Sequence, residues 1–321
     1  MEKQLEYTTR AGVIAEIYLQ NMELEITSGE VDQTKLDLRW QAEDKMQLED
    51  VITIEYMEDE NRLKIDEKKS NIKDAQLKLT IPPESKVVAE NTNGSTELSQ
   101  VSGRHIIRSE NGSIFARNID GEIQLKNENG SISLQNSEGK FKLKSENGSL
   151  KAKAVSGELK LSNVNGASKV VQCSGKLKIK SENGVIRVLQ AGCEKANISS
   201  VNAPIYFEFA SIKHGKFEFK NENGKTQILV PEDLPYDIEA ATKYGSLHVG
   251  IKGDYDSETE ERTKKIQMTQ GAGTVEIEVA NKLGGITIIP SGKGFIRRHI
   301  DLSFITETLD NVIEKIPPEH R

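Results

Sequence analysis

Aromatic side chains, cysteines and long apolar runs are all scarce in this chain. Aromatic residues make up 5% of its 321 residues, and there are two cysteines. Two cysteines in a chain of this length exclude a disulfide scaffold, and no run approaches the roughly 18 apolar residues of a membrane span. The opening residues, MEKQLEYTTR, contain no apolar signal-peptide core. We therefore expect a cytoplasmic protein without a transmembrane segment, with a surface or envelope location as the alternative.

The chain has an internal repeat instead of these features. Glycines occupy positions 94, 112, 130, 148, 166 and 184, and a second series falls midway at 103, 121, 139, 157 and 175. Asparagine precedes every glycine of the first series, whereas Ser, Asp or Glu precedes those of the second. Two unlike nine-residue units therefore make one 18-residue period. A repeat of this kind predicts one elongated array rather than separate globular domains.

Within each unit the residues alternate between apolar and polar. The positions two and four after the eleven glycines number 22, and 19 of them are apolar, the exceptions being Thr96, His105 and Ser168. The positions one and three after each glycine are polar in 18 of 22 cases. This period of two predicts a strand of about five residues in every unit, with its apolar side facing a core of Ile, Leu and Val.

These strands predict an all-β, single-chain β-solenoid, or β-helix, with 18-residue coils. An antiparallel meander is the alternative, but it would expose a broad apolar face. In a solenoid the two strands of each coil face one another across the core, and the coils stack about 4.8 Å apart. We expect an irregular N-terminal β-strand segment over 1–90, regular then degenerate repeats over 91–290, and a helical tail over 291–321. A solvated loop is expected over 253–265.

The tail has a helical pattern of apolar residues. An amphipathic helix is predicted over 304–316, followed by two prolines. Because a solenoid ends in an open core and unpaired strand edges, we expect this helix to cap it. Assembly with a partner and membrane binding are the alternatives.

The Asn-Gly pairs predict repeated turns. Because glycine adopts positive φ without steric cost, we expect Gly130 and Gly148 to lie in left-handed corners that tolerate asparagine better than valine. The asparagines can hydrogen-bond from coil to coil as an amide ladder. The structural turn ladder predicted in this way comprises Asn111, Gly112, Asn129, Gly130, Asn147, Gly148, Asn165, Gly166, Asn183 and Gly184.

Basic residues gather on the outward side of the second strand series. Residues 94–189 hold 15 Lys and Arg against 9 Asp and Glu, whereas residues 1–90 hold 12 against 21. The pattern favours either a soluble exposed sheet or a face that binds an anionic polymer, a lipid surface or an acidic protein. This possible anionic-ligand face comprises Arg104, Arg108, Lys126, Lys140, Lys142, Lys144, Lys160, Lys176, Lys178 and Lys180.

The repeat units, the preceding LKLTIPPESKVVAENTNGS and the closing AGTVEIEVANKLGGITI together carry a family resemblance. They resemble a bacterial β-strand-repeat family catalogued as a domain of unknown function and labelled "putative adhesin". The resemblance covers about residues 10–290. It implies a β-solenoid domain and no defined ligand.

No motif for catalysis is present. The five histidines are scattered, and the chain contains no metal-ligand spacing, nucleophile elbow or phosphate loop. The calcium-binding aspartate of nonapeptide β-rolls is replaced by an apolar residue. We therefore expect no enzyme activity and no cofactor. Whether Cys173 and Cys193 form a disulfide is left open.

These observations favour a non-enzymatic scaffold or interaction protein, and the family resemblance alone implies a role related to the bacterial envelope. Its expected partner is a protein or an anionic polymer rather than a specific nucleic-acid sequence, because the net charge is −7. Assembly into a homo-oligomer is a further alternative. The alternatives are a surface adhesin and a self-assembling cytoskeletal solenoid resembling the bactofilins.

Overall fold

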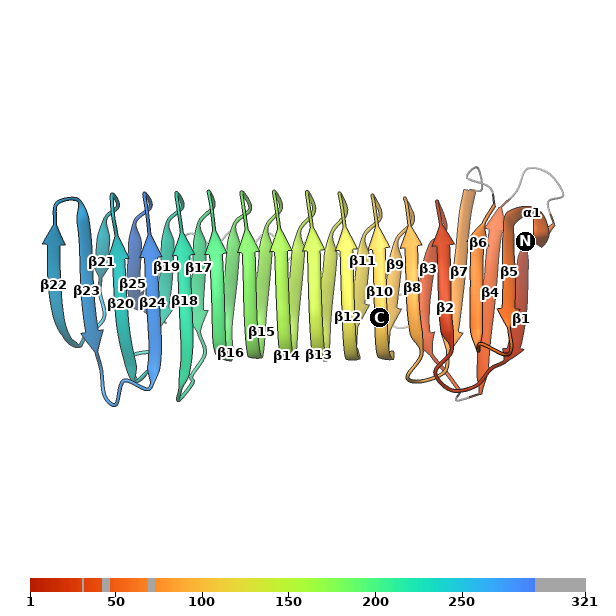
Figure 1. Cartoon of the computed structure of the whole chain (residues 1–321), viewed down its shortest axis with the longest axis horizontal. Helices are drawn as coiled ribbons and strands as arrows, with labels where there is room; N and C mark the ends of the chain where they lie inside the picture. Colours follow the sequence, from red (N-terminus) through yellow and green to blue (C-terminus); the bar gives the residue numbers. More distant parts are fainter. Residues whose placement is uncertain (31, 42–46, 69–72, 292–321) are drawn as a thin grey trace, which may run out of the picture.

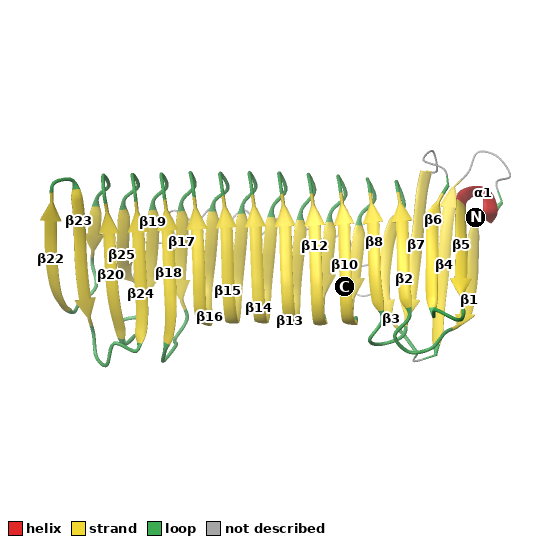
Figure 2. Ribbon diagram, viewed as in Figure 1, coloured by secondary structure: helices red, strands yellow, loops and turns green. Residues whose placement is uncertain are grey.

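The computed structural model describes residues 1–30, 32–41, 47–68 and 73–291, and in them the chain winds into a long, flat stack of strands (Figure 1). It contains 25 strands and one four-residue helix, α1 (Leu48–Val51). The all-β prediction is therefore confirmed, and Figure 2 shows strands along the whole length of the molecule. The predicted helix over 304–316 lies outside the described residues.

A central coil consists of two wall segments, a bend and a turn. In β13 (Ile132–Ser145), residues 132–135 lie in one wall, the chain bends at Asn136, and residues 137–145 lie in the opposite wall. We call the wall with residues 137–145 the front wall and the other the rear wall. Neighbouring strands are parallel, and Ile132 pairs with Leu150, 18 residues later. A four-residue turn that ends in Asn-Gly joins each of these front-wall strands to the next rear-wall strand.

The central coils run from β8 to β19, and β13 to β16 each pass through both walls without a break. Their bounds are β8 (Lys86–Asn91), β9 (Thr96–Ser99), β10 (Ser102–Ser109), β11 (Ile114–Arg117), β12 (Asp120–Asn127), β14 (Leu150–Asn163), β15 (Ser168–Ser181), β16 (Ile186–Ser200), β17 (Ile205–Phe209), β18 (Gly215–Asn221) and β19 (Thr226–Val230).

The core lies between the two walls. All 22 positions predicted to face inward are buried, including the polar Thr96, His105 and Ser168. Further along, Phe207, Phe217 and Phe219 are fully buried and pack edge to face, with ring centroids 5.0 and 5.9 Å from that of Phe207. Burial of this continuous apolar layer stabilises the stack.

The N-terminal end departs from sequence order. Strand β2 (Ile14–Leu19) pairs with β8 on one side and β6 on the other, and β3 (Glu23–Ser28) lies between β9 and β7. Antiparallel pairs then close both walls, β5 on β6 and β4 between β7 and β1. The remaining bounds here are β1 (Glu2–Thr8), β4 (Gln33–Gln41), β5 (Ile52–Met57), β6 (Arg62–Glu67) and β7 (Lys73–Ile81).

At the C-terminal end, strands are again inserted out of sequence order. Strand β24 (Val275–Asn281) lies between β18 and β20 (Tyr236–Thr242), and β25 (Ile286–Pro290) lies between β19 and β21 (Leu247–Val249). The prediction of a solvated loop over 253–265 is wrong, because these residues form most of an antiparallel hairpin that pairs with β20. Its strands are β22 (Asp254–Glu260) and β23 (Thr263–Thr269), and Ile266 and Met268 of β23 are buried.

The expected conformation of the Asn-Gly turns is also wrong. Neither Gly130 nor Gly148 has a φ in the left-handed region. A Cβ on Gly148 would lie 1.8 Å from the carbonyl oxygen of Gly130, so glycine is required because neighbouring coils approach so closely. Positive φ occurs instead in the second glycine series, for example 137° at Gly139, and at the bends, for example 49° at Asn136.

Candidate functional site

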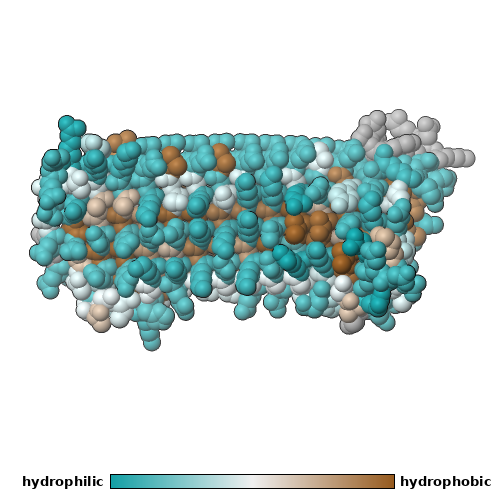
Figure 3. All heavy atoms as spheres, viewed as in Figure 1, coloured by the Kyte–Doolittle hydropathy of each residue, from teal (hydrophilic) through white to brown (hydrophobic). Residues whose placement is uncertain are grey.

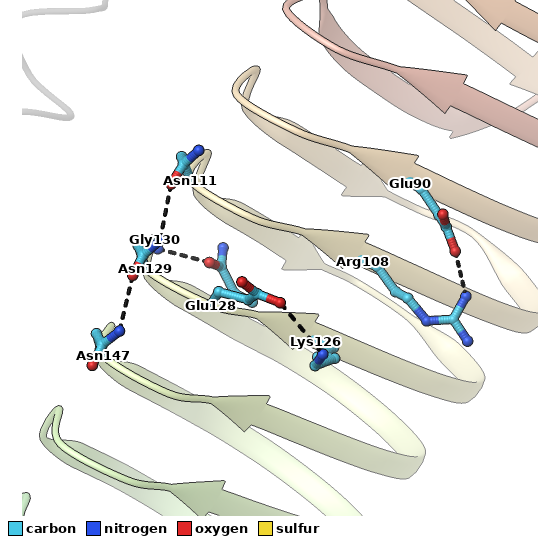
Figure 4. Close-up of polar contacts among 9 residues, drawn as sticks. Glu90, Arg108, Asn111, Lys126, Glu128, Asn129, Gly130 and Asn147 are labelled. Carbon is cyan, nitrogen blue, oxygen red and sulfur yellow. Dashed lines mark hydrogen bonds and ion pairs between the residues drawn. The ribbon is translucent and has the colours of Figure 1, made fainter.

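The most regular polar feature is a row of asparagine amides along the turns. The Nδ2 of Asn129 donates to Oδ1 of Asn111 at 2.9 Å, and the Nδ2 of Asn147 donates to Oδ1 of Asn129 at the same distance (Figure 4). These side chains are exposed, so the row lies at the surface. The ladder contains Asn21, Asn93, Asn111, Asn129, Asn147, Asn165, Asn183, Asn202 and Asn223.

A second, buried row lies at the first position of the same turns, where Asn and Ser alternate from Asn91 to Ser181. The Nδ2 of Asn163 donates 3.0 Å to the carbonyl oxygen of Gly148 in the preceding coil, and its Oδ1 accepts from the amide of Gly166. The smaller Ser181 bonds within its own turn, to the carbonyl oxygen of Gly184. Sequence reasoning missed this row, although the alternation of Asn and Ser every 18 residues is visible in the chain.

The exposed ladder predicts a modest stability effect. Asn147→Ala removes two amide bonds, one to Asn129 and one from Asn165 at 2.8 Å. Because a hydrogen bond open to water contributes little net, we expect a loss of about 1 kcal/mol in denaturant unfolding. Asn163→Ala should cost more, because it removes the partner of a buried carbonyl and that of a half-buried amide. Equal losses at the two sites would contradict this division.

The ten predicted basic residues all lie on the outer side of the front wall, on β10 and β12 to β15. Three of them, at its N-terminal side, are paired with carboxylates. Arg108 lies 2.7 Å from Glu90, Arg104 lies 3.7 Å from Glu122, and Lys126 lies 3.7 Å from Glu128, as Figure 4 shows for the first and third pairs. This part of the predicted face is therefore largely neutralised.

The remaining seven lysines form a continuous area with one further member. The register places Lys195 of β16 beside Lys176, a residue that sequence reasoning missed because a bulge shifts the repeat between Gly175 and Lys176. All eight side chains are exposed. We call them the lysine field: Lys140, Lys142, Lys144, Lys160, Lys176, Lys178, Lys180 and Lys195.

Few negative charges oppose the lysine field. Glu158 lies inside it and pairs with Lys160, and this hydrogen bond lowers the pKa of the Glu158 carboxyl. None of the other seven lysines forms an ion pair with a described residue. Figure 3 shows the hydrophilic side chains of this face standing in rows. The strand spacing fixes like charges about 5 Å apart, which creates a positive potential over a flat, rigid surface.

A shallow groove of about 690 Å³ borders the lysine field along the turns. Lys180 and Lys220 line it, and the smaller Ser162 and Ser199 lie on either side of Lys180. Val164 and Val201 line it where most other coils have glutamate. The groove adds a partly apolar strip to the basic surface.

The family model described as Toastrack DUF4097 matches residues 14–289. The chain belongs to this family. Two solved structures are similar to this Toastrack chain. A "putative cell adhesion protein" from Clostridium sporogenes is 10% identical, with 91% of this chain and 100% of that chain covered and a TM-score of 0.23. A "putative adhesin" from Bacteroides fragilis is 12% identical, with 90% and 97% covered and a TM-score of 0.32. No curated protein matches.

Three further features bear on what the Toastrack chain can do: metal-binding side chains, membrane-spanning helices and the buried histidine His105. In the part of the chain that the structure describes, no three His, Cys, Asp or Glu side chains are placed to hold a metal ion. Within the same residues no helix has the length and apolarity needed to cross a membrane. His105 is buried, which lowers the pKa of its imidazole, and its Nε2 lies 2.9 Å from the carbonyl oxygen of Ser102.

The two cysteines of the Toastrack chain are free thiols in neighbouring coils. In the parallel ladder between β15 and β16, Cys173 lies opposite Ala191 and Cys193 lies opposite Gly175, so the two cysteines are not opposite each other. Both are buried, and a hydrogen bond with Cys173, together with burial, raises the pKa of the Cys193 thiol. They pack as small apolar residues in the core.

Proposed function

We propose that this Toastrack chain is a non-enzymatic interaction scaffold whose lysine field binds an anionic partner. The structural unit of this scaffold is an 18-residue coil of two nine-residue units, which holds each lysine at a fixed height and spacing. The observation that carries the proposal is that seven of the eight lysines have no carboxylate partner among the described residues. A rigid row of unpaired cations gains most from a ligand with regularly spaced negative charges.

The charge of the molecule varies along its length in a way that supports this function. Residues 1–90 hold 12 basic and 21 acidic residues, and residues 231–291 hold 6 and 11, whereas residues 94–189 hold 15 and 9. Both ends therefore repel an anionic polymer and the centre attracts it. The acidic ends also repel one another, which disfavours the end-to-end assembly of a cytoskeletal filament.

Charge reversal on the field tests this function. The variant K140E/K142E/K176E/K178E should lose binding to anionic polymers and to vesicles with anionic lipids, because four cations become anions on a surface that keeps its backbone. Wild-type binding should weaken steeply between about 50 and 200 mM salt. Co-sedimentation with polyphosphate and with anionic vesicles measures both effects.

A matched variant controls for total charge. K153E/K213E/K225E/K264E changes the same number of exposed lysines away from the field, and it should bind like wild type. Wild-type protein that binds no polyanion at low salt would overturn the proposed function. Equal loss in both variants would show that net charge, and not the lysine field, controls binding.

A further inference from the structure

The front wall carries a second charged area beyond the lysine field. Seven exposed carboxylates occupy outward positions on β24, β20 and β22. Glu276 lies 3.0 Å from Lys216, and none of the other six forms an ion pair with a described residue. We call them the acid field: Glu276, Glu278, Asp237, Glu239, Asp254, Asp256 and Glu258.

The two fields are symmetric about one strand. The pairing order along the front wall is β13, β14, β15, β16, β18, β24, β20, β23 and β22. Four strands of the lysine field therefore precede β18, and four strands that carry or separate the acid field follow it. This order arises because β24 inserts between β18 and β20, out of sequence.

We propose that two copies of the chain associate face to face through their front walls, about a two-fold axis parallel to the strands over β18. This rotation places β13 of one copy over β22 of the other, β15 over β20 and β16 over β24. It leaves positions along the strand direction unchanged, so each outward row of one wall meets the same row of the other.

The register makes this arrangement complementary residue by residue. Lys140, Lys142 and Lys144 face Asp254, Asp256 and Glu258 of the other copy. Lys176 and Lys178 face Asp237 and Glu239, and Lys195 faces Glu276. The two-fold axis generates each of these six pairs a second time, with the roles of the two copies exchanged.

The remaining strands of the two walls oppose the association little. Strand β14 meets β23, whose outward Thr269 and Gln267 are uncharged. The outward, exposed Lys265 of β23 lies beside Glu258 and faces the uncharged Ser162 of the other copy. Like charges meet only at β18, where Lys216 and Lys220 already have carboxylate partners, Glu276 and Glu218.

The size of the face suits a dimer. Nine strands about 4.8 Å apart and five residues of about 3.3 Å each give roughly 700 Å² per copy. This is close to the roughly 800 Å² per partner of a standard protein interface. Because the complementarity lies in exposed charges, the association must be strong at low salt and lost at high salt.

A charge swap tests the dimer. Sedimentation equilibrium of the full chain should show a dimer at about 20 mM salt and a monomer at about 1 M. The variants K140E/K142E/K144E and D254K/D256K/E258K should each weaken dimerisation by about tenfold or more, because like charges then face each other. The combined six-residue variant should restore the dimer, and an equimolar mixture of the two triple variants should form heterodimers.

Several results would overturn the self-association. These are a monomeric wild type at low salt, a dimer insensitive to salt, or a combined variant that stays as monomeric as its parents. Circular dichroism should show the same β signal for every variant, since all six positions are exposed. K153E/K225E changes one lysine in the rear-wall part of β14 and one directly before the rear-wall strand β19, and it should dimerise like wild type.

The dimer and the proposed anion binding use the same lysines, but different results would contradict each of them. D254K/D256K/E258K leaves the lysine field intact, so it should bind polyphosphate at least as well as wild type while remaining monomeric. A monomeric wild type that binds polyphosphate would exclude the dimer and leave the proposed function standing.

Discussion

Replacing Leu143 with Asp will lower the free energy of unfolding by about 4 kcal/mol or more. Leu143 is fully buried, and its partners on the neighbouring coils are the equally apolar Leu125 and Leu161. An unpaired carboxylate in this layer has no hydrogen-bond donor, so its desolvation is not offset. Denaturant unfolding followed by β-type circular dichroism measures the loss.

The adjacent residue provides the control. Lys142 lies on the same strand, exposed and outward, so Lys142→Asp should change stability by about 0.5 kcal/mol or less. Comparable losses at the two positions would show that the walls do not separate a core from solvent. A loss confined to Leu143 supports the two-walled coil.

The coil interior could be predicted from the sequence because its cause is local. Period-two alternation alone placed residues such as Phe141 and Ile179 inside, and both are buried. The 18-residue spacing likewise placed the asparagines of successive turns above one another, and their side chains are hydrogen-bonded. The period of the repeat determines which residues of neighbouring coils lie beside each other, so no long-range information was needed.

The ends could not be predicted in the same way. The residues of β24 and β2 alternate like any other strand, and nothing local says that each inserts between two coils that come elsewhere in the sequence. The hairpin of β22 and β23 was hidden by its acidic residues, which are uncommon in strands. Its signal was the alternation of Ile266 and Met268, both buried.

The candidate site shows the same division. The lysine rows follow from the repeat and were predicted, whereas Lys195 was missed at a bulge. The acid field could not be found, because its residues come together only through the inserted β24 and the hairpin. Contacts that depend on which edge a strand joins lie beyond a single-sequence pattern.

Replacing Gly148 with Ala will destabilise the chain by about 3 kcal/mol. The new Cβ would lie 1.8 Å from the carbonyl oxygen and 2.5 Å from the carbonyl carbon of Gly130, and these backbone atoms cannot rotate away as a side chain can. Relief requires the two coils to separate, which stretches the hydrogen bond from Asn147 to Asn129. Denaturant unfolding measures the loss.

Gly192 is the matched control, because it lies in the same stack without the close approach. Its Cβ would meet only the carbonyl oxygen of Cys173, at an ordinary 3.5 Å, and its φ is not left-handed. Gly192→Ala should therefore change stability by about 0.5 kcal/mol or less. Gly148→Asn separates the two explanations of the turn, because asparagine tolerates positive φ but carries the same Cβ. If contact between coils sets the requirement, asparagine is at least as damaging as alanine; a tolerated asparagine would restore the left-handed turn.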